Sequence, residues 1–164
     1  MHTVELLLDP RLEQGVRDLW DRLHEAGLPS LATHRHPTNR PHLTLLTAAS
    51  PAGPPLPLPI PAELGPVRLL GRALVREVTA TAELRQIQAD IWSALPGEDR
   101  WPPPPDWTPH VSLALNVPAG RREAALHLLA GLPVEHGHFV AARSYDTETR
   151  TVTEQSLRSQ GLTG

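Results

Sequence analysis

Two short segments of the chain repeat the same order of residue types, and they constrain the fold more than any other feature. Residues 41–46 read PHLTLL and residues 109–114 read PHVSLA. Because alternate residues of a strand point to opposite faces, each segment places a histidine and a hydroxyl residue on one face and apolar residues on the other. The residues that share these polar faces are His42 with Thr44, and His110 with Ser112. We therefore expect two strands, each buried on one face and carrying an imidazole and a hydroxyl on the other.

The apolar spacing around these segments predicts helices and further strands. Helices are expected between Asp9 and Gly27, between Thr81 and Pro96, and from about Pro118 to Ala130. Strands are expected at residues 3–8, 31–36, 41–47, 67–78 with a turn at Gly71, 109–117, 134–143 and 149–153. The proline-rich residues 50–61 are expected to form an extended edge segment, and the last ten residues a weakly ordered tail.

The order of these elements predicts the fold class. The 164 residues, of which 40% are apolar, suffice for one domain with a sizeable core, or for two small lobes that share one. Helices and strands are mixed without strict alternation, which favours an α+β fold with antiparallel sheets. Each half of the chain, about 1–65 and about 66–160, has a helix upstream of its motif segment. We interpret this order as a weak internal duplication within a single domain, 1–164.

The composition excludes several kinds of chemistry. All 15 basic residues are arginine, which excludes a lysine nucleophile, and the absence of cysteine excludes disulfides and thiolate metal sites. The net charge of −3 argues against a long nucleic acid held through many phosphates, and leaves an RNA end or a small nucleotide. The first residues form no basic leader and no apolar run reaches the length of a membrane span, so a cytoplasmic protein without a membrane partner is expected. Nothing in the sequence indicates an obligate protein partner.

The paired motifs suit proton transfer on a phosphodiester. Histidine has an unperturbed pKa of about 6.5, so it can hold or release a proton near neutrality. Opening a cyclic phosphodiester needs a base that deprotonates water and an acid that protonates the leaving oxygen, and two imidazoles supply both without a metal or a cofactor. Serine and threonine hydroxyls can donate hydrogen bonds to the non-bridging oxygens of the phosphate.

These residues resemble a known family. His42-Leu43-Thr44-Leu45 and His110-Val111-Ser112-Leu113 resemble the two motifs of the 2H phosphoesterase superfamily, and the chain looks most like its 2′-5′ RNA ligase-like, or RNA 2′,3′-cyclic phosphodiesterase, branch. The resemblance implies two pseudo-symmetric lobes, each an antiparallel sheet with outer helices, around a central cleft. It also implies metal-independent opening of 2′,3′-cyclic phosphates of RNA 3′ ends or small cyclic nucleotides to 2′-phosphates, with 2′-5′ ligation in some members. The acid and base would be His42 and His110, and the phosphate clamps Thr44 and Ser112.

Three further residues are candidates for substrate binding. Arg40 lies two positions before His42, so it is expected on the same side of the strand as a phosphate contact. Trp107 adjoins a run of four prolines, where its ring either stacks a base at the cleft mouth or closes the loop onto the core. Tyr145 follows the strand after the third helix and is expected at the border of the cleft.

Two alternatives to a metal-independent enzyme remain open from the sequence. The first is a binding module for nucleotides or RNA ends that has the same cleft and no turnover. The second is a metal hydrolase that uses the pairs His34 with His36 and His136 with His138. Because no carboxylate or third ligand stands at a useful spacing from either pair, we interpret these histidines as ordinary strand residues and expect no metal site.

Overall fold

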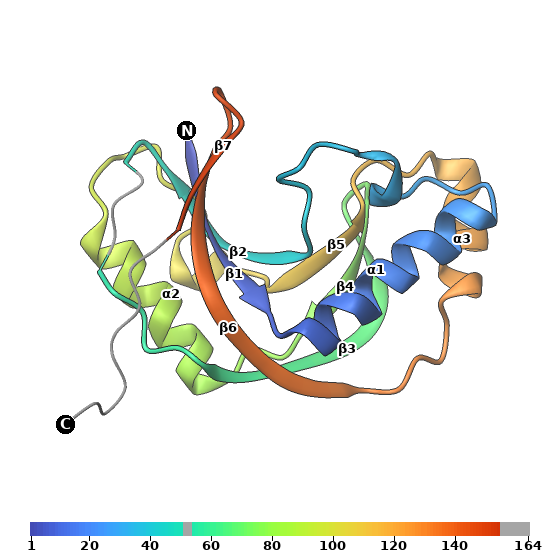
Figure 1. The fold of residues 1–164 in the computed structure, drawn as a ribbon, viewed down its shortest axis with the longest axis horizontal. Helices are drawn as coiled ribbons and strands as arrows, with labels where there is room; N and C mark the ends of the chain where they lie inside the picture. The colour runs from blue at the N-terminus through green and yellow to red at the C-terminus, as the bar shows by residue number, and fades with distance from the viewer. Residues whose placement is uncertain (51–53, 155–164) are drawn as a thin grey trace.

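Antiparallel strands and three α-helices make up the described part of the chain, which covers residues 1–50 and 54–154 of this computed structural model (Figure 1). The strands are β1 (His2–Leu8), β2 (His42–Ala48), β3 (Ile60–Leu70), β4 (Ala73–Val78), β5 (His110–Ala114), β6 (Glu135–Asp146) and β7 (Thr151–Glu154). The helices are α1 (Pro10–Glu25), α2 (Ala82–Ala94) and α3 (Arg122–Leu128). The expected α+β class with an antiparallel sheet is confirmed.

The strands join into one sheet in the order β1-β2-β5-β4-β3-β6-β7, and β6 also pairs with β1. The long, curved β6 makes this closure possible, because Phe139 pairs with Leu8 of β1 on one side and with Ile60 of β3 on the other (Figure 1). Six strands therefore form a closed ring of pairings, to which β7 adds at one edge of β6. The ring brings the two motif strands, β2 and β5, side by side.

The same order of elements occurs twice, as β1–α1–β2 and as β4–α2–β5. Both helices begin where the sequence predicts, because Asp9 accepts a hydrogen bond from the backbone N–H of Leu12 and Thr81 accepts one from that of Leu84. The helices lie at opposite ends of the molecule in Figure 1. Each packs against the motif strand of the other set: α1 contacts β5, and α2 contacts β2.

The apolar faces of both motif strands lie in the core, as expected from their alternation. The inward side chains are Leu43 and Leu45 on β2, and Val111 and Leu113 on β5, all 0% exposed. They pack with the buried faces of the two longer helices, which are Leu12, Val16, Leu19 and Leu23 on α1, and Leu84, Ile87 and Ile91 on α2. Burial of one face therefore sets which way the polar residues of each motif point.

The strand expected at residues 31–36 is wrong. Leu31–Thr33 form a single 3₁₀ turn, and the chain then continues as a loop to β2. Ser30 explains the turn, because its hydroxyl accepts from the N–H of Ala32 and donates to the carbonyl of Trp20 on α1. The loop that follows is important because it forms one wall of the candidate site.

Other element boundaries differ from the expected ones. The third helix begins at Arg122 rather than near Pro118, because a 3₁₀ turn occupies Ala119–Arg121. The hairpin turn at Gly71 is confirmed, with a positive φ of 60°, but its first strand begins already at Ile60. The expected tail, the last ten residues, lies outside the described residues, as do residues 51–53 of the expected proline-rich edge segment. No helix in the described part of the chain is long and apolar enough to cross a membrane.

Candidate active site

The two motifs meet at one pair of residues in the sheet. Leu43 of β2 is the partner of Val111 of β5, and both side chains are completely buried. In an antiparallel pair, the residues on either side of such partners also lie opposite each other and point to the other face. The residues placed opposite each other on that half-exposed face are His42 with Ser112, and Thr44 with His110. Each histidine therefore lies across from the hydroxyl of the other motif.

Both imidazoles are oriented by the same kind of hydrogen bond. Nδ1 of His42 lies 2.7 Å from the carbonyl oxygen of Arg40, and Nδ1 of His110 lies 2.7 Å from that of Thr108. Because a carbonyl oxygen only accepts, Nδ1 is the donor in both rings. This arrangement fixes the tautomer and leaves Nε2 of each ring as the atom that takes up or releases a proton.

Two buried tryptophans donate hydrogen bonds to the backbone of the motif strands. The indole N–H of Trp20, on α1, donates to the carbonyl of Ser112 at 3.1 Å. The indole N–H of Trp107, in the loop before β5, donates to the carbonyl of Thr44 at the same distance. Each ring comes from one motif half and anchors the hydroxyl residue of the other. Of the two expectations for Trp107, its burial fits a ring that closes the loop onto the core.

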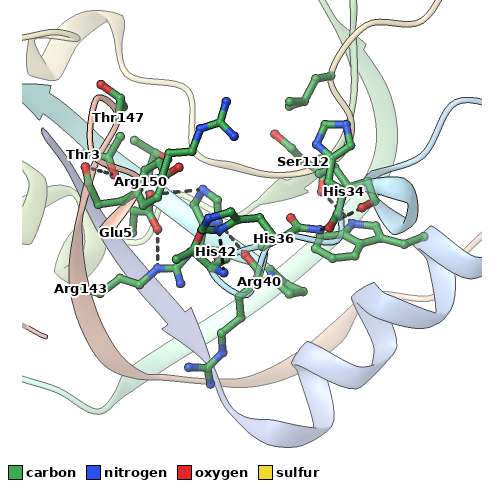
Figure 2. A pocket seen from close by; sticks show the side chains of 18 of the residues that line it. Thr3, Glu5, His34, His36, Arg40, His42, Ser112, Arg143, Thr147 and Arg150 are labelled. Carbon is green, nitrogen blue, oxygen red and sulfur yellow. Dashed lines mark hydrogen bonds and ion pairs between the residues drawn. The ribbon is translucent and has the colours of Figure 1, made fainter. Parts of the chain in front are cut away.

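A pocket of about 690 Å³ opens over this face, with His42, Thr44 and Ser112 in its wall. The loop between α1 and β2 forms a second wall of the pocket. Residues near the β6–β7 turn form a third wall. Figure 2 shows His42 between a charged group of side chains, which includes Glu5 and Arg143, and an end formed by Ser112 and His34. His110 is not among the lining residues, although it stands beside Thr44 on the same face.

The environment of His110 favours its neutral form. Burial lowers the pKa of His110 below 6.5, and the nearby positive charges of Arg68 and His42 lower the pKa further, while the hydrogen bond to Thr108 opposes the shift. Arg68 is held there by an ion pair with Glu77 of β4. A neutral imidazole with a free Nε2 can act as a general base at neutral pH.

Sequence reasoning missed a buried carboxylate beside His42. Glu5, on β1, is 2% exposed, and its Oε2 lies 3.6 Å from Nε2 of His42. Arg143 of β6 donates to the other oxygen, Oε1, at 2.7 Å. The signal was present in the sequence, because a glutamate interrupts the apolar run of β1, and a buried charge needs a partner.

The other two residues expected to bind substrate, Arg40 and Tyr145, both line the pocket. Arg40 lines the pocket, but its guanidinium forms an ion pair with Glu13 of α1. Figure 2 shows its side chain running from the pocket towards that helix. Tyr145 lines the pocket, as expected of a residue at its border.

The two His-x-His pairs do not come together. His34 and His36 line the pocket over the motifs, whereas His136 and His138 line a second pocket, of about 750 Å³, beside Asp9 and Glu63. Within residues 1–50 and 54–154, no three side chains of His, Cys, Asp or Glu are close enough together to hold a metal ion.

Comparison with known proteins adds no family to this description. Neither the models of known protein families nor the curated proteins include a match to this chain. Its function is therefore inferred from the geometry of the motif strands and the pocket above them.

Proposed function

We propose that this protein is a metal-independent phosphodiesterase that opens 2′,3′-cyclic phosphates, of RNA 3′ ends or of small nucleotides, to 2′-phosphates. One observation carries the proposal: two imidazoles on neighbouring strands have Nδ1 bound to a backbone carbonyl, which leaves Nε2 for proton transfer, and each lies across from a hydroxyl. Acid–base catalysis on a phosphodiester needs two proton-transfer groups and donors for the charged oxygens, and this face holds both.

In the proposed reaction, one imidazole acts on the attacking water and the other on the leaving 3′ oxygen. One Nε2 takes a proton from water as the water oxygen bonds to phosphorus. The bond from phosphorus to the 3′ oxygen breaks, and the other Nε2 protonates that oxygen. The hydroxyls of Thr44 and Ser112 donate to the non-bridging oxygens. A 5′-hydroxyl that replaces water as the nucleophile gives a 2′-5′ linkage, so 2′-5′ RNA ligation belongs to the same proposal.

In this proposal the duplicated order of elements forms two pseudo-symmetric lobes around a central cleft. The sets β1–α1–β2 and β4–α2–β5, and the crossed hydrogen bonds of Trp20 and Trp107, support it. Both features suit the 2H phosphoesterase resemblance of the motifs. Within the described residues, four arginines line the pocket, Arg35, Arg40, Arg143 and Arg150, against one carboxylate, Glu5, which suits an anionic substrate. The location proposed for the protein is the cytoplasm, as expected from the sequence.

The test is a substrate panel with product mapping. Purified protein is given 2′,3′-cyclic mononucleotides, RNA with a cyclic end, and ADP-ribose 1″,2″-cyclic phosphate, with and without EDTA. We expect turnover of at least one substrate to a 2′-phosphate, at the same rate with EDTA. A 3′-phosphate product, or activity lost with EDTA and restored by a divalent ion, would contradict the proposal. Tight binding of a 2′-phosphonucleotide without any turnover would indicate a binding module instead.

A further inference from the structure

Three neighbouring strands place a charged row beside the candidate active site. In the strand pairings, Glu5 of β1 is the partner of Thr44 on β2 and of Arg143 on β6. Glu5 and Arg143 are both almost completely buried. The carboxylate therefore stands between an arginine on one strand and the first motif on the other, at the wall of the pocket.

The two oxygens of Glu5 have different partners. Oε1 accepts from Nε of Arg143, and the same guanidinium donates through Nη2 to the carbonyl of Thr38, at 2.9 Å. These bonds hold the positive charge on the side of the carboxylate away from β2. Oε2 accepts from the hydroxyl of Thr3 and faces Nε2 of His42 at 3.6 Å. The negative charge of the carboxylate therefore faces Nε2 of His42, while Nδ1 of the same ring is bound to the backbone.

The second histidine has the opposite electrostatic setting. On β4, Val75 is the partner of Ser112, in the place that Glu5 takes opposite Thr44 on β1. Glu77 is the partner of His110, but its carboxylate forms an ion pair with Arg68. Burial and the charge of Arg68 lower the pKa of His110. The duplicated motifs are therefore matched in geometry and opposed in charge.

We propose that Glu5 is a positioning residue that keeps a proton on Nε2 of His42, so that His42 is the acid and His110 the base when a cyclic phosphate is opened. This inference rests on the proposed function. Nε2 of His110 takes a proton from water, whose oxygen bonds to phosphorus. The bond from phosphorus to the 3′ oxygen breaks, and that oxygen takes the proton from Nε2 of His42. Exchange of one proton with solvent at each ring restores the starting state.

Other charged and titratable groups also border the pocket, and they bear on its pH dependence. His110 on β5 interacts electrostatically with His42 and with Arg68 of β3. The loop and the β6–β7 region contribute His34, Arg35, His36, Arg40, Arg143, Tyr145 and Arg150. Among the groups that line the pocket, Glu5 is the one carboxylate within the described residues. Removal of Glu5 should therefore destabilise the protonated form of His42 more than a change at any other of these lining residues.

The experiment is the pH dependence of kcat for cyclic-phosphate opening in Glu5→Gln and Arg143→Gln. The acid must be protonated, so its loss sets the alkaline limb of the profile. Glu5→Gln removes the negative charge, and we expect its alkaline limb to move down by about one pH unit, with the acid limb unmoved. Arg143→Gln leaves the carboxylate and removes its counter-charge, so its alkaline limb should stay or move up. A purely structural role for the pair would affect both variants in the same way.

Two further variants control for misfolding and for the general effect of removing a carboxylate. Removing one partner of a buried ion pair can prevent folding, and the double variant Glu5→Gln/Arg143→Gln removes both charges together. It should show the same downward move of the alkaline limb. The matched control is Glu135→Gln, which removes the carboxylate next to another buried arginine, Arg76, away from the pocket, and should leave both limbs in place.

An alkaline limb that stays in place in the Glu5 variants overturns the inference, even if activity falls. If the wild-type protein opens no cyclic phosphate, the proposed function fails, and imidazole ¹⁵N spectra of His42 test the inference by itself. Across a pH series, we then expect Nε2 of His42 to lose its proton at a lower pH in Glu5→Gln than in the wild-type protein. The same spectrum for both proteins would overturn the role of Glu5.

Discussion

At the scale of single residues, the candidate site is defined by what each side chain is bound to. His42 and His110 are alike in sequence context and in the length of the hydrogen bond at Nδ1. They differ in their surroundings, because the carboxylate of Glu5 stands beside Nε2 of His42, whereas burial and the positive charge of Arg68 act on His110. Two similar motifs can therefore perform different steps of one reaction.

The first prediction concerns the loss of either imidazole. We expect His42→Ala and His110→Ala each to lower kcat for cyclic-phosphate opening by roughly 10²–10⁴, the usual effect of removing a general acid or base. Steady-state kinetics with a 2′,3′-cyclic nucleotide measure the effect, and the melting temperature checks the fold. His136→Ala, at an exposed histidine of the second pocket, is the control and should retain full activity. Full activity in the double variant of the two motif histidines would rule out their role.

The second prediction follows from the lowered pKa of His110. A base works only when neutral, so activity should be lost as the pH falls through the pKa of His110, which lies below 6.5. The acid limb of kcat/KM against pH should therefore lie below 6.5. Arg68→Met removes a positive charge that contributes to the shift, so its acid limb should move to higher pH. An acid limb above 6.5 in the wild-type protein would contradict the assignment.

At the scale of elements, each motif strand is held by a tryptophan from the opposite motif half. Trp20 reaches from α1 to the carbonyl of Ser112, and Trp107 reaches from the loop before β5 to that of Thr44. The bonds go to the backbone of the hydroxyl residues, so they hold the main chain from which each hydroxyl projects. The helices are exchanged between the halves in the same way, because α1 packs on β5 and α2 packs on β2.

The third prediction tests this anchoring. Trp20→Phe keeps an apolar ring and leaves the buried carbonyl of Ser112 without its indole donor, which costs about 1–3 kcal/mol of unfolding free energy. We expect kcat to fall as well, because Ser112 loses its support. Urea unfolding and steady-state kinetics measure the two effects. Trp92→Phe, on a partly buried ring of α2, is the control and should leave kcat unchanged. An unchanged kcat in Trp20→Phe would show that the bond does not position the hydroxyl.

At the scale of the whole molecule, closure of the sheet brings the two motifs together. The ring closes through the long β6, which pairs with β1 and with β3. The pairing of β2 with β5 is short and runs through the partners Leu43 and Val111. A change at this pair should therefore lower kcat as well as stability, because it alters the spacing of the two imidazoles.

The fourth prediction compares two buried leucines. Leu43→Ala and Leu64→Ala should each lower the unfolding free energy by about 2–5 kcal/mol, because both side chains are fully buried. Only Leu43→Ala removes the contact between the motif strands, so it should also lower kcat of the folded protein. Urea unfolding and kinetics well below the melting temperature measure both effects. Equal kcat in the two variants would show that the β2–β5 contact does not set the catalytic spacing.

The sequence by itself determined the local features of this protein. Alternation within PHLTLL and PHVSLA predicts which side chains leave the core, and the caps at Asp9 and Thr81 predict where two helices begin. These features depend on residues a few positions apart, so local periodicity and hydrogen bonding suffice. The strand expected at residues 31–36 failed because the hydroxyl of Ser30 competes with extended structure.

The tertiary structure alone decided which groups act on the two histidines. Glu5 reaches His42 because β1 pairs with β2, and Arg143 reaches Glu5 because β6 closes the ring on β1. Trp107 is a core residue because its indole finds a carbonyl on β2. Strand pairing and burial depend on contacts between distant parts of the chain, and an alternating pattern specifies the face of a side chain without specifying its neighbour.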